Sequence, residues 1–576
     1  MAYATDIIDQ RLLGRVGCPI LPVFPVETEM YEGDQLNDFN KVEHKVKDVL
    51  VKHSIVFSHL FLAWRNSRDD AERQLTLMIT SEYKPIYQQQ WIDTVTDIRL
   101  LLQKSEIQWS VELITALMLS GQRGKTLPIL STDHDLIHGW SKARPDFLVR
   151  IQHHDWVAID VLYRGYVNET YATISVSACD ANDSSWDTTL LDLRQVLEDH
   201  HLDAKVELLF SKGLDYMLMN QGCTEPHHTV RDIFYNRRLS MGTSCTTSGS
   251  DRSGTLGGWI RLKKESTLDL GLTNYHVLRN GLPQDNPSEP FPPIQGFSYG
   301  DVVSPSNNDH KNATNLLEKE IRHLKAEYES LESLLDNISR DDPIWEKQFR
   351  IKDNMENTLD SLRNQLKYAE DYSREVGPIY SASGFRTRKG RAIDWCLFWV
   401  KQPCLISRTL QIHGMPSNLG YISSQDGSEA LTRYYSISPD KNYEVAKRGR
   451  TSGWTGGTLS AIDTTICLSG KHLHKRIPTT QYIEFKDKFG GKAVCVHTIT
   501  STTAEPFIGR GDSGAFVLLN ESLDSTGKGL AIIGMGFAAN DGNLASYMMP
   551  FDILVEDIED VTGGKVIEPR FAGKLD

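Results

Sequence analysis

The chain has 576 residues, a net charge of −14 and 24% charged residues, and 40% of its residues are hydrophobic. This length exceeds what one hydrophobic core usually holds, so we expect several domains of ordinary soluble composition. The negative charge, without a basic stripe carrying interleaved aromatic residues, argues against a nucleic-acid partner, which needs clustered Lys and Arg.

Residues 1–27 lack the charged start and clean apolar stretch of a signal peptide, and no run reaches the length of a membrane-spanning helix. We therefore expect no membrane association. The eight cysteines are scattered without a CxxC pair, which predicts neither a zinc site nor a disulfide framework. We expect an intracellular, cytoplasmic protein in a reducing compartment, with no metal or cofactor.

Residues 1–235 alternate between helical and strand-like patterns, which predicts an α/β or α+β domain. Helical spacing covers residues 41–64, 89–104 and 186–200. Strand-like runs cover residues 73–83, 109–119, 156–165, 170–179 and 204–210. This part contains no phosphate-binding loop or glycine-rich fingerprint, so we expect a prodomain or regulatory domain.

The segment Ser240–Gly254 is rich in Ser, Thr and Gly, which predicts a loop or linker at a domain boundary. The chain beyond it shows short apolar runs separated by turns, typical of an all-β barrel or sandwich. We expect this domain to cover residues 236–576. The predicted strands cover residues 254–262, 268–278, 392–400, 434–438, 492–500, 514–519 and 530–537.

Residues 310–376 interrupt the β pattern with two helical repeats. Apolar residues recur four and three apart from Leu317 to Ile338 and again from Met355 to Ala369, across a polar turn at residues 339–343. This spacing predicts an antiparallel coiled-coil hairpin inserted into the β domain. It is either a solvated helical pair without chemistry or an arm for a protein partner or self-association.

Three residues at the ends of apolar strands can form a nucleophilic triad. Serine needs an adjacent base, usually a histidine oriented by a buried carboxylate. His276 follows a strand in LTNYHVL, Asp394 begins the strand IDWCLFWV, and Ser513 lies in GRGDSGAFV. Burying Asp394 is costly unless it is hydrogen-bonded, and an imidazole N–H would satisfy it. The alternatives are a core histidine, a turn aspartate with Asp301 as the acid, and a plain loop serine.

The order His276, Asp394, Ser513 resembles the chymotrypsin-like class and differs from subtilisin and the α/β-hydrolases. Residues 240–576 resemble a trypsin/chymotrypsin-fold serine protease, nearest to intracellular HtrA-like and fungal types. TNYHV is similar to the HtrA-type histidine motif, IDWCL to the aspartate motif and GDSG to the nucleophile motif. The segment Lys447–Ile462 resembles the hairpin that opens the second barrel, and residues 545–558 resemble the closing strand and C-terminal helix.

The resemblance implies a double barrel and roles for several residues. His276 and Asp394 would come from the first barrel and Ser513 from the second, and the backbone N–H groups of Gly511 and Ser513 would form the oxyanion hole. Phe507, six residues before the nucleophile, would lie at the base of the specificity pocket, and Gly536 would lie near the substrate backbone. The implied substrate is a protein or peptide with a small or hydrophobic residue before the cleaved bond.

The resemblance also raises the question of activation. In secreted relatives the aspartate before the nucleophile pairs with a newly freed N-terminus, and Asp512 holds that position here. The dibasic pair Arg237–Arg238 would be a cleavage site. The alternative is that Asp512 only caps nearby backbone N–H groups.

Two further features have competing interpretations. The segment Lys471–Lys475, KHLHK, has two histidines but no evident third ligand, so we expect a solvated basic hairpin rather than a metal site. The expected function of the chain is a serine endopeptidase regulated by its N-terminal domain. The alternative is a catalytically silent protease-fold scaffold that binds a partner through the coiled-coil hairpin or the N-terminal domain.

Overall fold

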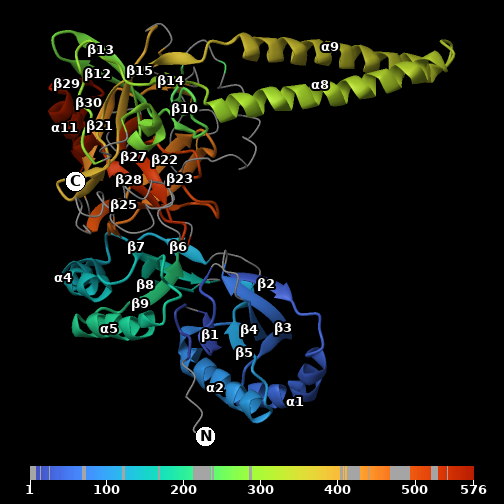
Figure 1. Ribbon diagram of the computed structural model, residues 1–576, viewed down its shortest axis with the longest axis vertical. Coiled ribbons are helices and arrows are strands. Elements are labelled where there is room, and N and C mark those ends of the chain that lie inside the picture. The colour runs from blue at the N-terminus through green and yellow to red at the C-terminus, as the bar shows by residue number, and fades with distance from the viewer. Residues whose placement is uncertain are drawn as a thin grey trace.

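The computed structural model (Figure 1) describes most of the chain. The described residues are 8–12, 14–24, 26–67, 73–119, 124–166, 169–211, 235, 239–283, 288–402, 406–407, 409–411, 415, 428–438, 440–467, 493–520, 530–540 and 542–575.

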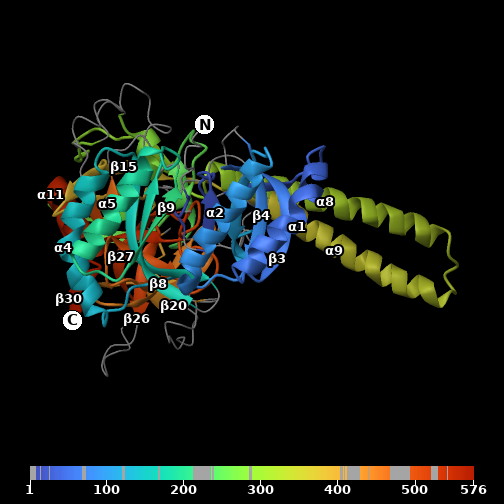
Figure 2. The ribbon, with the colours of Figure 1, turned by 90° about the horizontal axis from the view of Figure 1, so that it is seen from below.

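The predicted multidomain organisation is confirmed. Figures 1 and 2 show two sheets with helices in the N-terminal part, a larger β-rich part that adjoins the second of them, and a long helical hairpin that projects sideways from the β-rich part.

The first N-terminal sheet has five strands in the order β1-β5-β4-β3-β2. Its elements are β1 (Arg15–Cys18), β2 (Val26–Met30), α1 (Leu36–Lys52), β3 (Phe57–Ser67), β4 (Gln74–Ser81), α2 (Gln88–Lys104) and β5 (Ser110–Ile114), followed by the short helix α3 (Ala116–Leu119). Helix α1 buries Val42, Val46 and Leu50, one turn apart. The helix predicted over residues 41–64 is wrong beyond Lys52, because Ile55, Val56 and Phe57 favour the extended strand that follows.

The second N-terminal sheet repeats the first in a shorter form. Its elements are β6 (Lys125–Leu127), α4 (His134–Ile151), β7 (Trp156–Tyr166), β8 (Glu169–Ala178), α5 (Ser185–Asp199) and β9 (Lys205–Phe210). In both sheets a helix precedes an antiparallel strand pair, and a second helix leads to a strand that runs parallel to the second member of the pair. The repeated order is therefore helix, strand, strand, helix, strand.

Matching side chains support this internal repeat. Arg65 on β3 holds Glu112 on β5 with two hydrogen bonds (2.9 and 2.7 Å), and Arg164 on β7 holds Glu207 on β9 likewise (3.1 and 3.1 Å). All four side chains are buried. Helices α2 and α5 also share a sequence pattern. Each contains a buried tryptophan, Trp91 or Trp186, and each has Thr, Asp, Arg and Leu at the same distances after that tryptophan. The two units are therefore copies of one structural motif.

The second repeat joins the β-rich part through an edge-to-edge strand pair. Strand β7 pairs antiparallel with β24 (Thr464–Cys467), with Ile159 opposite Thr465. The buried Asp160 next to it accepts hydrogen bonds from Thr464 and from the three side chains Asn540, Asn543 and Tyr547 (3.1, 2.6 and 3.0 Å). This junction, which we call the β7–β24 seam, makes the N-terminal part structurally continuous with the β-rich part.

The β-rich part contains a closed barrel of six strands. Around the barrel the strands are β22 (Glu444–Gly449), β23 (Gly453–Leu459), β25 (Ala493–Ser501), β28 (Ser546–Pro550), β27 (Leu530–Ala539) and β26 (Phe516–Asn520). β26 pairs back onto β22, which closes the ring. Helix α11 (Phe551–Thr562) follows β28 directly.

The rest of the β-rich part is an open, half-barrel sheet of eight strands in the order β11-β10-β14-β15-β18-β13-β12-β29. Its strands are β10 (Ser244–Thr247), β11 (Gly254–Thr255), β12 (Gly258–Lys263), β13 (Thr267–Thr273), β14 (Asp301–Val303), β15 (Glu375–Ala382), β18 (Cys396–Trp399) and β29 (Lys565–Glu568). The loop or linker predicted over Ser240–Gly254 is wrong for residues 244–247, which form β10, and the segment is largely buried. The Ser306 N–H donates to Ser244 Oγ (2.9 Å), whereas the buried hydroxyl groups of Thr246 and Thr247 have no hydrogen-bond partner among the described residues.

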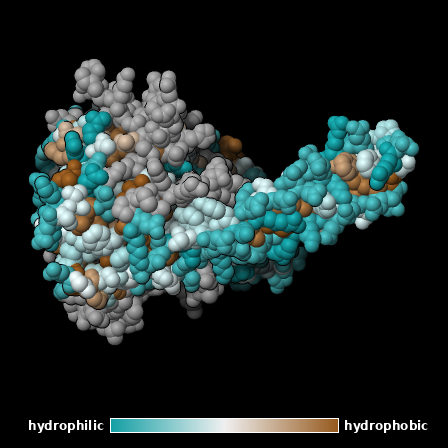
Figure 3. Space-filling model, turned by 90° about the horizontal axis from the view of Figure 1, so that it is seen from above, coloured by the Kyte–Doolittle hydropathy of each residue, from teal (hydrophilic) through white to brown (hydrophobic). Residues whose placement is uncertain are grey.

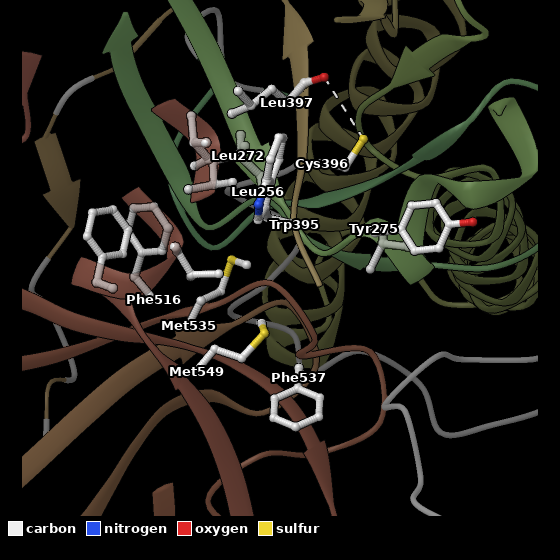
Figure 4. Packing of buried hydrophobic residues seen from close by; sticks show 14 of the residues in the cluster. Leu256, Leu272, Tyr275, Trp395, Cys396, Leu397, Phe516, Met535, Phe537 and Met549 are labelled. Carbon is white, nitrogen blue, oxygen red and sulfur yellow. Dashed lines mark hydrogen bonds between the residues drawn. The ribbon is translucent and has the colours of Figure 1, made fainter. Parts of the chain in front are cut away.

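One hydrophobic core unites the two β structures. Leu256, Leu272 and Trp395 from the half-barrel sheet belong to the same buried cluster as Phe516 and Met535 from the closed barrel. Figure 4 shows these side chains together with Phe537 and Met549 between the two sets of strands. Burial on both sides therefore fixes the position of one β structure against the other.

Two long helices, α8 (Asn307–Asp336) and α9 (Pro343–Asp371), form an antiparallel hairpin between β14 and β15. Figure 3 shows it as a mainly hydrophilic projection interrupted by hydrophobic patches. Its exposed apolar side chains are Leu334, Ile344, Phe349, Ile351 and Tyr368. The helical hairpin is present where it was predicted, while coiled-coil packing and self-association stay predictions.

Among the helices that the structure describes, none has both the length and the apolar character needed to cross a membrane.

Candidate active site

His276 and Asp394 are in direct contact. His276 lies in the short helix α7 (Tyr275–Leu278), which follows β13, and Asp394 lies in the turn before β18, the neighbour of β13. Asp394 Oδ1 accepts from the His276 backbone N–H (3.0 Å), and Oδ2 contacts Nδ1 of the ring. Because a carboxylate only accepts, Nδ1 carries the proton and Nε2 is left as the basic nitrogen.

Neighbouring side chains fix Asp394 in this position. Asn274 Nδ2 donates to the Asp394 carbonyl (2.7 Å). The next residue, Trp395, donates its backbone N–H to Ser383 Oγ (2.8 Å) and its indole N–H to Asp557 on α11 (2.7 Å). Hydrogen bonds therefore hold the backbone at Asp394 and at Trp395, and the Asp394 carboxylate that contacts His276 has little freedom to move.

The turn that carries Ser513 packs against the half-barrel sheet beside the strand that leads to His276. The Thr255 N–H donates to the Ser513 carbonyl (2.8 Å), and Thr255 Oγ1 donates to the Gly511 carbonyl (2.9 Å). A Cβ at Gly514, which has φ +97°, would lie 2.3 Å from Thr273 Oγ1, at the end of β13. This close approach requires glycine at position 514. Because Thr273 lies three residues before His276 in the sequence, the Ser513 turn contacts the end of the strand that leads to His276.

The Ser513 side chain is completely buried and donates to the Phe537 carbonyl on β27 (3.0 Å). His276 and Asp394 are buried as well. The structure describes the side chains of both Ser513 and His276 and shows no hydrogen bond between them. The Ser513 hydroxyl would have to rotate away from the Phe537 carbonyl to donate to His276.

Two backbone N–H groups of this turn have no acceptor among the residues that the structure describes. They belong to Gly511 and Ser513, whereas the intervening Asp512 N–H donates to the Gly509 carbonyl (3.0 Å). Gly511 has φ +96°, a conformation that side chains other than glycine rarely adopt. Two unengaged N–H groups on one tight turn are suited to hold a developing negative charge.

Asp512 is fully buried and forms an ion pair with the equally buried Lys447 on β22 (Nζ to Oδ2, 2.5 Å). It also accepts from the backbone N–H groups of Thr451 and Gly509 (3.0 and 2.9 Å) and from Ser452 Oγ (2.5 Å). Burial alone would raise the pKa of Asp512, but Lys447 and these donors together lower it. The cation beside Asp512 is therefore an internal lysine, in addition to the predicted backbone caps.

The two residues predicted to form the substrate pocket have different surroundings. The Phe507 ring lies in the core of the closed barrel and is fully buried, with Lys447 Nζ 6.0 Å from the ring centroid. Gly536 on β27 accepts from the Gly514 N–H (3.0 Å) and donates to the Ala515 carbonyl (2.9 Å). The backbone of Gly536 thus supports the Ser513 turn, and its predicted contact with a substrate stays a prediction, as does the pocket role of Phe507.

The other candidates are not part of this arrangement. Asp301, the alternative acid, is partly exposed on β14 and lies 3.7 Å from Lys401 Nζ. The dibasic pair Arg237–Arg238 and the segment Lys471–Lys475 lie outside the described residues. Among the described side chains, no group of three or more His, Cys, Asp or Glu could hold a metal ion.

Sequence patterns missed four residues that support the site: Thr255, Asn274, Lys447 and Arg450. Lys447 had one usable signal, since it follows the apolar residues Val445 and Ala446 in a strand-like run. A charged residue in such a run needs a buried partner. Arg450 lies in the turn after this strand and had no such signal. Neither partner could be identified, because Asp512 and Asp309 are distant in the sequence.

Comparisons with known proteins add no assignment to this geometry, since no protein-family model and no curated protein matches the chain.

Proposed function

We propose that the protein is a serine endopeptidase with Ser513 as nucleophile, His276 as general base and Asp394 as the carboxylate that orients it. One observation carries the proposal: the buried His276–Asp394 pair lies beside a glycine-bounded serine turn with two unengaged backbone N–H groups. These are the parts that acyl transfer requires, in three separate segments of the chain.

The proposed reaction begins when Ser513 Oγ attacks the carbonyl carbon of a peptide bond while His276 Nε2 takes the hydroxyl proton. The N–H groups of Gly511 and Ser513 bind the oxygen that becomes negative. As the C–N bond breaks, His276 returns the proton to the leaving amine, and an acyl-enzyme remains. Water, deprotonated by His276, then attacks the ester and releases the acid and Ser513.

The fold supports this proposal in outline. The closed six-stranded barrel carries Ser513, and the half-barrel sheet carries His276 and Asp394. We interpret the pair as a chymotrypsin-like double barrel of the intracellular HtrA-like or fungal type. Hydrolysis of a peptide substrate between the two barrels is the corresponding activity, and the N-terminal part would regulate it through the β7–β24 seam.

A catalytically silent scaffold is the second candidate, and two observations favour it. The Ser513 hydroxyl donates to Phe537 rather than to His276, and the hairpin exposes apolar side chains that could bind a partner. The complete set of His276, Asp394 and Ser513 favours the enzyme, since a scaffold needs none of them.

Digestion of a denatured protein decides between the two candidates. Full-length protein incubated with casein should release new peptides, while Ser513→Ala should lower the rate by several orders of magnitude. N-terminal analysis of the products would identify peptide-bond cleavage and the residue before it. Equal digestion by wild type and Ser513→Ala would contradict the proposal, and no digestion by either would favour the scaffold.

A further inference from the structure

The first turn of α8 is embedded in the half-barrel sheet, although most of the hairpin lies in solvent. Ser306 caps the helix by accepting from the Asp309 N–H (3.3 Å), and its own N–H donates to Ser244 Oγ on β10 (2.9 Å). Asn307 donates to the Ser250 carbonyl (2.9 Å). This first turn, residues 306–309, is called the foot of the hairpin below.

The foot is joined to the closed barrel by a buried ion pair. Arg450, in the turn between β22 and β23, contacts Asp309 Oδ1 with its Nη2, and both side chains are almost completely buried. Two charges removed from water must remain paired, because a single unpaired charge is strongly destabilising. The pair therefore holds the foot and the β22–β23 turn together.

Arg450 also lies directly against the turn that carries the proposed oxyanion hole. A Cβ at Gly511 would lie 2.4 Å from Arg450 Nη1, so only glycine leaves room for the guanidinium. The Arg450 backbone N–H donates to Thr255 Oγ1 (3.0 Å), which donates to the Gly511 carbonyl (2.9 Å). Arg450 thus supports Gly511 from two directions, through its side chain and through Thr255.

We infer that Arg450 and Asp309 are positioning residues, through which the foot of the helical hairpin holds Gly511 in the orientation that stabilises the oxyanion. This inference rests on the proposed function, because it assigns a purpose to a contact beside the same site. Its physical basis is that oxyanion donors act only when they are held in place before the reaction. A displacement of about 1 Å near reacting groups can lower the rate about 100-fold.

The inference can be tested on the full chain with a fluorophosphonate, which reacts with an activated serine and needs no knowledge of the substrate. We would measure the maximal inactivation rate, kinact, and the half-saturation constant, KI. Arg450→Lys keeps a cation near Asp309 but lacks the planar fork that lies against Gly511. We expect kinact to fall about 10- to 100-fold and KI to change less than about twofold.

The double variant Asp309→Asn with Arg450→Met separates positioning from stability. Replacing both partners of a buried ion pair is often tolerated, whereas removal of one is not. We expect the double variant to keep a melting temperature near that of the wild type and still to show the lowered kinact. Asp336→Asn, an exposed position at the far end of α8, is the matched control and should match the wild type in both constants.

Three outcomes are informative. Lowered kinact with unchanged KI in both Arg450 variants supports the inference. Wild-type kinact in folded Arg450→Lys and in the double variant overturns it, while labelling of the wild type leaves the proposed function intact. An absence of labelling in the wild type itself would overturn the proposed function, and the inference with it.

Discussion

At the scale of single residues, the ion pair between Lys447 and Asp512 has the clearest consequence for activation. Both side chains are fully buried, and Asp512 directly precedes Ser513 in the chain. The sequence had suggested a freed N-terminus as the partner of Asp512. Lys447 supplies the cation instead, so we expect the Ser513 turn to be ordered without cleavage near Arg237–Arg238.

The first prediction concerns Lys447→Met. Removing the lysine leaves the Asp512 carboxylate buried without its cation, which should lower the free energy of unfolding by about 3–5 kcal/mol. The turn should also lose its order, so reaction with a fluorophosphonate should slow. Thermal unfolding and labelling rate of the full chain measure the two effects.

The control for Lys447→Met is Lys441→Met, an exposed position just before β22. That variant should unfold and react like the wild type, because surface substitutions rarely change stability by more than about 0.5 kcal/mol. A Lys447→Met protein as stable and as reactive as the wild type would contradict the role given to the ion pair.

The sequence allowed the candidate triad to be named because each member has a local signal, a polar residue at the end of an apolar strand. It did not allow Lys447 to be matched with Asp512 or Arg450 with Asp309. The first pair depends on how β22 meets the turn before β26 within the closed barrel, and the second on how that barrel packs against the first turn of α8. A single sequence does not show which distant residues come together. The hydrogen bond from Ser513 to Phe537 was equally unpredictable, because a hydroxyl rotamer has no sequence signal.

At the scale of elements, the β7–β24 seam is stabilised by a carboxylate with uncharged partners. Burial raises the pKa of Asp160, and hydrogen bonds from Thr464 and Asn543 only partly offset this effect. The folded state therefore binds the Asp160 proton more tightly than the unfolded chain. The contribution to stability is fully present below the unfolded pKa and is lost as the pH rises from there through the folded pKa.

The second prediction follows for Asp160→Asn, which stays neutral at every pH. Relative to this variant, the wild type should become progressively less stable as the pH rises from about 4, the ordinary aspartate range. Urea unfolding at several pH values between the acidic range and neutrality measures the difference. Asp440→Asn, an exposed aspartate, is the control and should show no such trend. Parallel curves for the wild type and Asp160→Asn would refute the assignment.

Element types were predictable where the hydrophobic period was long and regular, as in α2, α5, β7 and β8. Other predictions failed for physical reasons. The helix predicted over residues 41–64 ends at Lys52, since the apolar residues beyond it fit either period and lead into β3. The loop or linker predicted over Ser240–Gly254 contains the short strand β10, which pairs with β11 and β14. The internal repeat was detectable, since Trp91 and Glu112 are separated by the same interval as Trp186 and Glu207.

At the scale of the whole molecule, the second repeat of the N-terminal part and the β-rich part share one extended sheet. Strand β24 uses β7 as its neighbour, and Thr464, Asn540, Asn543 and Tyr547 use Asp160 as their acceptor. Residues 129–131 add further contacts, since the Ile129 N–H donates to Ser460 Oγ (3.1 Å). The N-terminal part thus shares buried hydrogen bonds with the β-rich part, and its role as a prodomain or regulatory domain stays a prediction.

The third prediction is that a chain beginning at Ser240 is less stable than the full protein and does not gain activity. Truncation exposes the edge of β24 and leaves buried donors unsatisfied, at about 1–3 kcal/mol for each group. A chain beginning at residue 124 keeps the seam and is the matched comparison, with higher stability expected. A stable Ser240 chain that reacts faster with a fluorophosphonate would instead show that the N-terminal part is an inhibitory domain.

If Ser513 is a nucleophile activated by His276, it forms a covalent bond with a fluorophosphonate. Full-length protein would be treated with a fluorophosphonate and digested, and the modified peptide identified by mass spectrometry. We expect modification of Ser513 in the wild type, and its loss in both Ser513→Ala and His276→Ala. Undiminished labelling of Ser513→Ala, or a wild type that takes up no label, would contradict the claim.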